Sequence, residues 1–266
     1  MCESKLLNVK IIRPKIHFIP DVVYSQAETL ESPNKLLQMD ILKPELNKKL
    51  PAVIFVTGGG FISANRARMP QLRMKLAQEN FVVASINYRT VPNSTFPAPI
   101  VDVKAAIRFL KANSERFNVD SEKIFLLGDS AGGYLVTFAA VTNSNLFNVG
   151  ENLNYSSKIA AAVNLYGFVD IKSLKAFPQM LESLKVPVEE TNPLNYINKN
   201  SAPMLLMHGT ADEIVSPEQT ELLFQALRSH GIESERYLIP NANHADEHWQ
   251  QDDVLAVIVK FLKNFL

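Results

Sequence analysis

The sequence is poor in cysteine, in net charge and in long apolar runs. Its only cysteine, Cys2, stands next to the terminus; this excludes an internal disulfide framework, and we expect no catalytic role for this thiol. Lysine plus arginine and aspartate plus glutamate number 27 each, so no net field attracts nucleic acid or an anionic membrane. No stretch approaches the roughly 18 apolar residues of a membrane helix, and the first residues lack a signal peptide's apolar core. We therefore expect a cytoplasmic protein that binds a small, nearly neutral partner.

An alternation of buried strands and helices runs through most of the chain. Of its 266 residues 47% are apolar, enough for a sizeable core. Apolar runs typical of strands buried on both faces occur at 52–57, 81–88, 123–129, 160–167 and 203–209. Helical periodicity follows at 71–80, 99–117, 131–143, 217–231 and 252–266. The pattern predicts one α/β domain over 1–266, with a mostly parallel sheet covered by helices on both faces.

Two regions depart from this alternation. Within residues 7–50, short alternating patches at 9–19 and 36–42 predict edge strands and turns. Residues 168–200 are too long for a minimal connection between two strands and contain one expected helix, around 177–185. Because ligands bind at the carboxyl ends of the strands in such a sheet, we expect this insertion to form a small cap or lid. A surface excursion without a functional role is the alternative.

The most informative stretch is Gly128-Asp129-Ser130-Ala131-Gly132, which ends a buried strand and begins a helix. In this context Gly-x-Ser-x-Gly is typical of a sharp turn that exposes the serine hydroxyl above the sheet. A side chain two positions before or after the serine would crowd the turn, and the helix N-terminus favours developing negative charge. The pattern predicts that Ser130 is a nucleophile.

A serine hydroxyl needs a base to remove its proton, so a histidine held by a carboxylate is expected downstream. His244 lies in a polar loop before the last helix and is the favoured base, with His248 as its competitor. His208 ends a buried strand, where a core or turn-supporting role is favoured over catalysis. The remaining histidines are His17 and His230.

The favoured acid is Asp212, in the loop after the strand at 203–209. It stands at the end of the sheet where the nucleophile is expected, and its place between serine and histidine follows the chain order of this kind of site. Glu213 and Asp246 are the alternative carboxylates.

Three glycines, 58–60, follow the strand at 52–57. A phosphate loop would carry lysine and then serine or threonine after the glycines, and a dinucleotide-binding motif would space its glycines more widely. Neither pattern is present. Consecutive residues without side chains let backbone N–H groups converge on an oxygen, so the glycines predict an oxyanion hole rather than a plain turn.

Several motifs occur in the order shown by one enzyme group: "GGGF", "NYRTVPNSTFPAPIVDVKAAIRFL", "GDSAGG", "HGTADEIV" and "ANHAD". Over about residues 35–266 the chain resembles the α/β-hydrolase esterases of the hormone-sensitive-lipase-like group and their short-chain carboxylesterase relatives. The resemblance implies an α/β-hydrolase fold with a catalytic triad and an oxyanion hole of backbone amides. The triad would be Ser130, Asp212 and His244, and the amides those of Gly59, Gly60 and Ala131.

The chain departs from that group in two places. Thr57 stands where these enzymes usually carry a histidine thought to brace the glycine loop, and a threonine hydroxyl reaches less far. The N-terminal region predicts strands where larger relatives carry helical cap segments. A smaller cap favours short acyl groups over long lipid chains.

We therefore expect a serine carboxylesterase that hydrolyses short-chain, acetyl-like esters through an acyl-enzyme, with neither metal nor organic cofactor. Carbohydrate or aromatic alcohols are candidate carriers of the acyl group. A prolyl-oligopeptidase-type peptidase is one alternative, against which the glycine loop speaks. A non-catalytic small-molecule receptor is another, against which the retained histidine speaks. A homo-oligomer stays open.

The expected substrate contacts are apolar side chains near the oxyanion loop and in the insertion. They are Phe61, Phe168, Phe177, Met180 and Leu184, and for each of them packing in the core or the insertion is the alternative. Arg66 and Arg68, just past the glycines, are expected to be solvated at the surface rather than to bind substrate.

Overall fold

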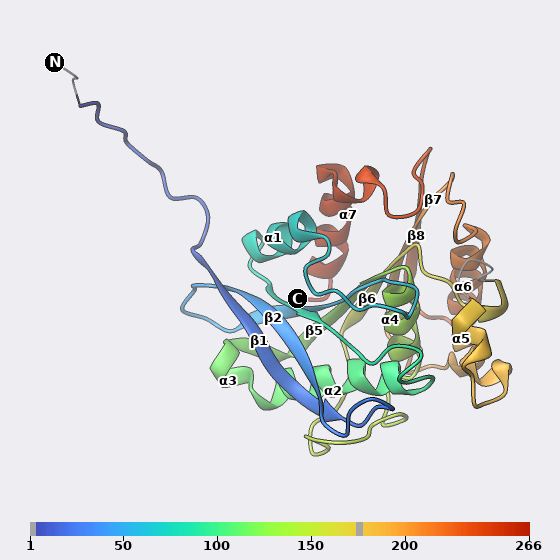
Figure 1. Ribbon diagram of the computed structural model, residues 1–266. Coiled ribbons are helices and arrows are strands. Elements are labelled where there is room, and N and C mark those ends of the chain that lie inside the picture. Colours follow the sequence, from blue (N-terminus) through green and yellow to red (C-terminus); the bar gives the residue numbers. More distant parts are fainter. Residues whose placement is uncertain (1–3, 174–177) are drawn as a thin grey trace.

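The computed structural model describes residues 4–173 and 178–266, in which an eight-stranded sheet lies between two layers of helices (Figure 1). The strands, in chain order, are β1 Ile16–Ala27, β2 Lys35–Pro44, β3 Leu50–Val56, β4 Val82–Ile86, β5 Val119–Asp129, β6 Ala161–Leu165, β7 Met204–Gly209 and β8 Ser234–Ile239. In space their order is β1-β2-β4-β3-β5-β6-β7-β8. Strand β2 runs antiparallel to both its neighbours, and every other pairing is parallel. The predicted mostly parallel sheet is confirmed.

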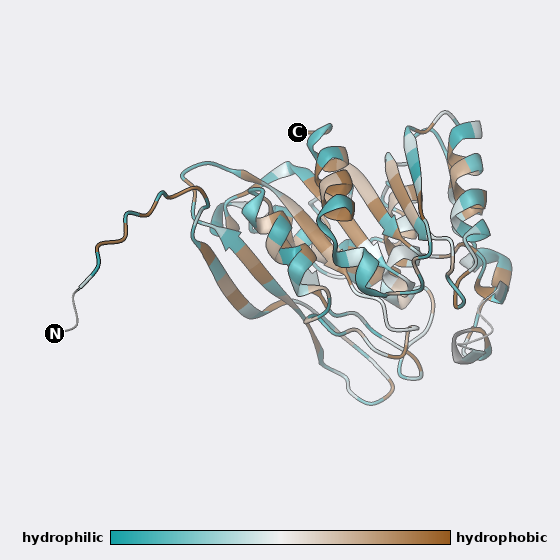
Figure 2. Ribbon diagram, turned by 90° about the horizontal axis from the view of Figure 1, so that it is seen from above, coloured by the Kyte–Doolittle hydropathy of each residue, from teal (hydrophilic) through white to brown (hydrophobic). Residues whose placement is uncertain are grey.

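Helices cover both faces of this sheet. They are α1 Pro70–Gln78, α2 Ala98–Ala112, α3 Ser114–Phe117, α4 Ala131–Val141, α5 Pro178–Glu182, α6 Glu218–Ser229 and α7 Asp252–Lys263. Helices α2, α4 and α6 share one buried apolar cluster with one face, and α1 and α7 share a second cluster with the other. In Figure 2 the strands between these layers are largely hydrophobic. Burial on both faces explains why their sequences read as continuous apolar runs.

The N-terminal prediction was right in kind and wrong in extent. Strands β1 and β2 form, but residues 9–15 stay outside the sheet and extend away from the body of the molecule (Figure 1). The physical reason is the lack of a partner strand, because the register of β1 with β2 starts with Ile16 opposite Pro44, the last residue of β2.

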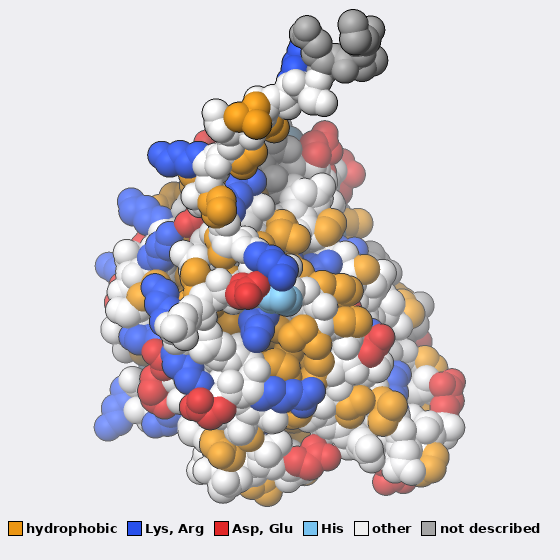
Figure 3. Space-filling view, turned by 90° about the vertical axis from the view of Figure 1, so that its left-hand side faces the viewer, with side chains coloured by type: hydrophobic (Ala, Val, Ile, Leu, Met, Phe, Trp, Pro, Cys, Tyr) orange, Lys and Arg blue, Asp and Glu red, His pale blue; other side chains and the backbone are white. Residues whose placement is uncertain are grey.

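On the face seen in Figure 3, charged side chains of both signs lie among apolar ones.

The segment between β6 and β7 contains α5 and three 3-10 turns, η1 Ile171–Ser173, η2 Val188–Thr191 and η3 Pro193–Tyr196. Helix α5 is shorter than the expected 177–185. Leu184, Val186 and Val188 pack against the apolar cluster that contains α4. The Thr95 hydroxyl, before α2, lies 3.3 Å from that of Ser183. The segment therefore lies against the body of the molecule, whereas its action as a cap stays a prediction.

Cys2, for which we expect no catalytic role, lies outside the described residues. Within the described part of the chain, no helix has both the length and the apolar character needed to cross a bilayer.

Candidate active site

Ser130 occupies a strained turn between β5 and α4. Its φ of 52° and ψ of −118° lie outside the regions that non-glycine residues favour. Its amide donates to the carbonyl of Leu165 at 2.9 Å. A Cβ at Gly128 would lie 2.4 Å from the Gly132 carbonyl oxygen, and one at Gly132 would lie 1.9 Å from that of Val56. Only glycine permits this approach, which is why the motif needs both.

The structure brings Ser130, His244 and Asp212 into one hydrogen-bonded chain. Ser130 Oγ lies 2.9 Å from His244 Nε2, and His244 Nδ1 lies 2.8 Å from Asp212 Oδ2. The serine follows β5, the aspartate follows β7 and the histidine follows β8. Because these strands are parallel, their carboxyl ends meet at one edge of the sheet. The arrangement can activate a hydroxyl as a nucleophile.

The other candidate bases and acids lie in different contacts. His248 Nδ1 bonds Asp246 Oδ1 at 3.0 Å, so these two alternatives bind each other. His17 bonds Glu45 at the surface, and His230 contacts its own helix end. Glu213 is exposed.

Asp212 is buried and held from several sides. Its Oδ1 accepts the amides of Ile214 and Val215 at 2.9 and 2.8 Å. Its Oδ2 faces His208 Nε2 at 3.3 Å as well as His244. Burial raises the pKa of Asp212, but hydrogen bonds from His208, His244 and the Val215 amide lower it by more, leaving it well below its usual range. The carboxylate therefore stays ionised and can stabilise an imidazolium.

His208 is a second imidazole on this carboxylate. Its Nε2 lies 2.9 Å from the Val215 carbonyl, which can only accept, so this nitrogen carries a proton. Its Nδ1 lies 3.1 Å from the Thr220 hydroxyl. The side chain is fully buried. The expected turn-supporting position is found, but the bond to Asp212 was not foreseen, because it depends on how the loop after β7 folds back.

The glycine loop leaves backbone donors beside Ser130. Within residues 4–173 and 178–266, the amides of Gly59 and Gly60 donate to no protein acceptor. Ala131 is the first residue of α4, where an amide has no partner within the helix. Gly60 has a φ of 59° and Gly59 one of 144°, both unfavourable for other residues. These three amides are available for an oxyanion; that role stays a prediction.

Arg66 and Arg68 are partly exposed, as expected for solvated side chains, but both also form ion pairs that were not foreseen. Arg66 pairs with Asp21 at 2.6 Å and Asp40 at 3.3 Å. Arg68 pairs with the buried carboxylate of Asp129 at 2.8 Å. Burial lowers the pKa of Arg68, but the charge of Asp129 and its hydrogen bond raise it by more. The chain after the glycines folds back on the sheet, which sequence spacing does not reveal.

Two of the five predicted apolar contacts lie in the core. Phe61 and Phe168 are 0% and 1% exposed, and both rings pack on Tyr134. Both rings are buried because they pack against each other and against Tyr134. Leu184 is half-buried against the core. Phe177 and the side chain of Met180 lie outside the described part.

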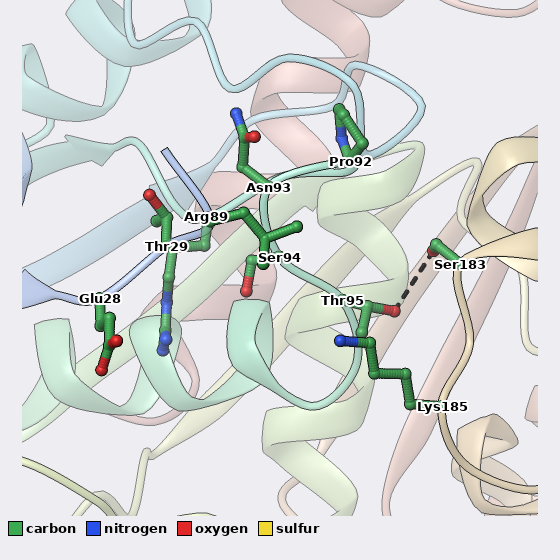
Figure 4. Close-up of a pocket in the computed structure, with 10 residues that line it drawn as sticks. Glu28, Thr29, Arg89, Pro92, Asn93, Ser94, Thr95, Ser183 and Lys185 are labelled. Carbon is green, nitrogen blue, oxygen red and sulfur yellow. Dashed lines mark hydrogen bonds between the residues drawn. The ribbon is translucent and has the colours of Figure 1, made fainter. Parts of the chain in front are cut away.

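Two cavities lie beyond the glycine loop. Ile62, which is 49% exposed, lines one of about 250 Å³ together with Val91, Pro92 and Ser183. The other, of about 410 Å³, shares Pro92 and Ser183 with it and has walls of mixed polarity, with the Thr95–Ser183 bond on one side (Figure 4). In the described part of the chain, no three His, Cys, Asp or Glu side chains are grouped to hold a metal ion.

Known proteins are similar to this chain in sequence and in fold. The family model of BD-FAE matches residues 39–227. Esterase LipC of Mycobacterium tuberculosis is 28% identical over 80% of this chain and 57% of its own length. The isoprenylcysteine alpha-carbonyl methylesterase ICME of Arabidopsis thaliana is 27% identical over 83% of this chain and 59% of its own. The chain thus spans less than two thirds of the length of these curated relatives.

One solved structure has a similar fold over nearly the whole length of this chain. The truncated form of a carbohydrate esterase from gut microbiota superimposes with a TM-score of 0.81 at 26% identity, covering 93% of this chain and 95% of that one. The α/β-hydrolase fold is therefore established.

Proposed function

The chain belongs to the BD-FAE family, and on that premise we propose that it is a serine carboxylesterase acting on short-chain carboxylic esters. The observation that carries the proposal is the unbroken hydrogen-bonded chain from Ser130 through His244 to Asp212. The esterase names of the relatives support the same reaction class.

The proposed reaction proceeds in two halves. Ser130 Oγ attacks the ester carbonyl while His244 Nε2 takes its proton, and Asp212 stabilises the imidazolium. The amides of Gly59, Gly60 and Ala131 bind the negative oxygen of the tetrahedral intermediate. Collapse of the intermediate breaks the ester bond, and the imidazolium returns the proton to the departing alcohol.

Water completes the cycle. It attacks the acyl-serine, His244 takes one of its protons, and collapse releases the carboxylic acid while the serine regains its proton. This route uses only groups of the chain and water, so the proposed enzyme needs neither metal nor organic cofactor.

We further propose acetyl-like acyl groups, carried by carbohydrate or aromatic alcohols, as the substrate class. The cavity of about 410 Å³ has a size typical of small-ligand sites, and the apolar cavity of about 250 Å³ at Ile62 next to it is somewhat smaller. Residues 168–200 would act as a small cap on a single domain spanning 1–266. The single cysteine suits a reducing compartment and supports a cytoplasmic enzyme.

The test compares the wild type with Ser130→Ala on p-nitrophenyl acetate. We expect the substitution to lower kcat by roughly 10³-fold or more while circular dichroism stays unchanged. A fluorophosphonate should label the wild type on the peptide that contains Ser130. Retained turnover in the variant would exclude the proposed nucleophile. Faster cleavage of an aminoacyl arylamide than of the ester would favour the peptidase, and absence of both labelling and turnover would favour a receptor.

A further inference from the structure

We propose that Arg68 and Asp129 are positioning residues that hold the oxyanion loop, defined as residues 57–68, against the turn that carries Ser130. The proposal rests on the proposed esterase function and concerns how its oxyanion donors are kept in place. These two residues would also explain how the loop is held although Thr57 stands where the resembling enzymes usually carry a histidine.

Asp129 contacts both ends of the oxyanion loop. Its side chain is fully buried. Its Oδ1 accepts the amide of Gly58 at 2.7 Å, and its Oδ2 accepts Arg68 Nη2 at 2.8 Å. Both distances are short, as expected for hydrogen bonds to a charged group. One carboxylate, adjacent in sequence to Ser130, thereby ties the start and the end of the loop to the nucleophile turn.

Gly58 and Arg68 are matched to this carboxylate, whose Oδ2 also lies 3.5 Å from the Tyr166 hydroxyl. A Cβ at Gly58 would lie 2.7 Å from Asp129 Oδ2, so the amide approaches only because this residue has no side chain. A buried carboxylate is costly unless a cation compensates it, and Arg68 provides that cation. Arg68 is itself fixed, because its carbonyl accepts Arg73 Nε from α1 at 2.8 Å.

Thr57 does not perform this task. Its hydroxyl is buried and has no hydrogen-bond partner in the part of the chain that the structure describes. Its backbone carbonyl accepts the Tyr88 hydroxyl at 2.8 Å. The side chain therefore contributes packing, and the loop is held from the other side by Asp129.

The consequence for catalysis follows from the position of the donors. Gly59 and Gly60 are the two residues after the amide that Asp129 binds. Donors stabilise an oxyanion well only when they are fixed before the charge develops. Removing the Arg68 side chain leaves the carboxylate without its cation and breaks the link between the far end of the loop and the nucleophile turn, while Arg73 still holds the backbone carbonyl at position 68. We expect this change to weaken binding of the transition state more than binding of the substrate.

The experiment compares Arg68→Ala with Arg66→Ala on p-nitrophenyl acetate. Arg66 is a matched control, because it lies in the same loop and in ion pairs, with Asp21 and Asp40 rather than Asp129. Arg68→Ala should lower kcat by about 10- to 100-fold, less than or equal to the loss of a whole oxyanion donor, with KM changed less than about threefold. Affinity for a boronic acid, which forms a tetrahedral adduct on Ser130, should fall in parallel.

Chemical rescue separates a missing guanidinium from general damage. Arg68 lines a cavity of about 190 Å³ that also contains Met69, Tyr166 and Trp249, so a small cation can reach the vacated position. Millimolar guanidinium should restore much of the activity that Arg68→Ala has lost. It should not raise the activity of Arg66→Ala. Arg68→Lys, which keeps the charge, should retain more activity than Arg68→Ala and serves as the test if the alanine variant does not fold.

Equal kcat values for Arg68→Ala and Arg66→Ala would overturn the proposal, as would a loss that appears only in KM or that guanidinium does not reverse. These results leave the esterase function intact, because the wild type still turns over the ester. A wild type without esterase activity would instead refute the proposed function, and the positioning role would fall with it.

Discussion

Replacing His208 with leucine should lower the stability of the protein more than its catalytic rate. The imidazole is fully buried and makes three contacts, to the Val215 carbonyl at 2.9 Å, the Thr220 hydroxyl at 3.1 Å and Asp212 Oδ2 at 3.3 Å. Leucine has a similar volume and can make none of them.

The three losses differ in size. Among the described residues the Val215 carbonyl loses its only side-chain partner, in a buried site, which costs about 1–3 kcal/mol. The Thr220 hydroxyl keeps its bond to the Pro217 carbonyl, so its loss is small. The bond to Asp212 is long, and that carboxylate retains two backbone amides and His244. Together we expect a free energy of unfolding lower by about 2–4 kcal/mol, and a kcat within about tenfold of the wild type because Asp212 stays in place.

Urea unfolding and turnover of p-nitrophenyl acetate measure the two effects. His230→Leu is the control, since His230 is exposed at the end of α6, and its free energy of unfolding should change by less than about 0.5 kcal/mol. A change below about 1 kcal/mol in His208→Leu would refute the reasoning about the buried contacts. A loss of activity as large as that of an Asp212 variant would refute the claim that His208 only supports the carboxylate.

The stability difference should also depend on pH. Hydrogen bonding, including that from His208, holds the pKa of Asp212 below its unfolded value despite burial. A depressed carboxyl pKa contributes stability above the unfolded value of about 3.9, and this contribution is lost as the pH falls toward the folded pKa. Removing His208 makes the depression smaller. The difference in the free energy of unfolding between wild type and His208→Leu should therefore be largest near neutral pH and should become smaller below about pH 4.

Three further substitutions test the site. Asp212→Asn should lower kcat by about 10⁴-fold, because an amide no longer holds the imidazole in the required tautomer, whereas His248→Ala should leave kcat nearly unchanged; comparable losses in the two would reverse the choice of His244. Thr57→Val should keep kcat within about threefold and raise the free energy of unfolding by up to about 1 kcal/mol, because it removes a buried hydroxyl without a partner; a loss near 100-fold in turnover would show that the hydroxyl holds the loop after all.

The sequence predicted best where one local segment carries all the information. The turn at Ser130 is an example, since Gly128 must lack a side chain to approach the carbonyl of Gly132, which is four residues further on. The order of strands and helices was equally readable, because burial on both faces of a parallel sheet imposes apolar runs. The distant aspartate and histidine could be chosen because parallel strands bring their carboxyl ends to one edge.

Prediction failed where a side chain's environment depends on distant segments. Phe61 looked like a substrate contact beside the glycines, but its ring packs inward on Tyr134. Arg68 looked like a solvated cation, yet it pairs with a carboxylate 61 residues away in sequence. Residues 9–15 had the pattern of a strand, but no strand of the described structure pairs with them beyond Ile16. In each case the local sequence was compatible with two environments, and the contacts with residues distant in sequence determined which one formed.

By itself, then, the sequence determined the α/β class, the nucleophile turn and the order in which serine, aspartate and histidine follow the strands, because these depend on local periodicity and on glycines that tolerate close backbone approach. Only the tertiary structure decided what surrounds them: that Asp129 binds both ends of the glycine loop, that His208 shares the carboxylate of Asp212, and that the Thr57 hydroxyl is left without a partner among the described residues. The physical reason is that hydrogen bonds and ion pairs between distant residues depend on distances of a few tenths of an ångström, which the folded chain sets and sequence spacing does not.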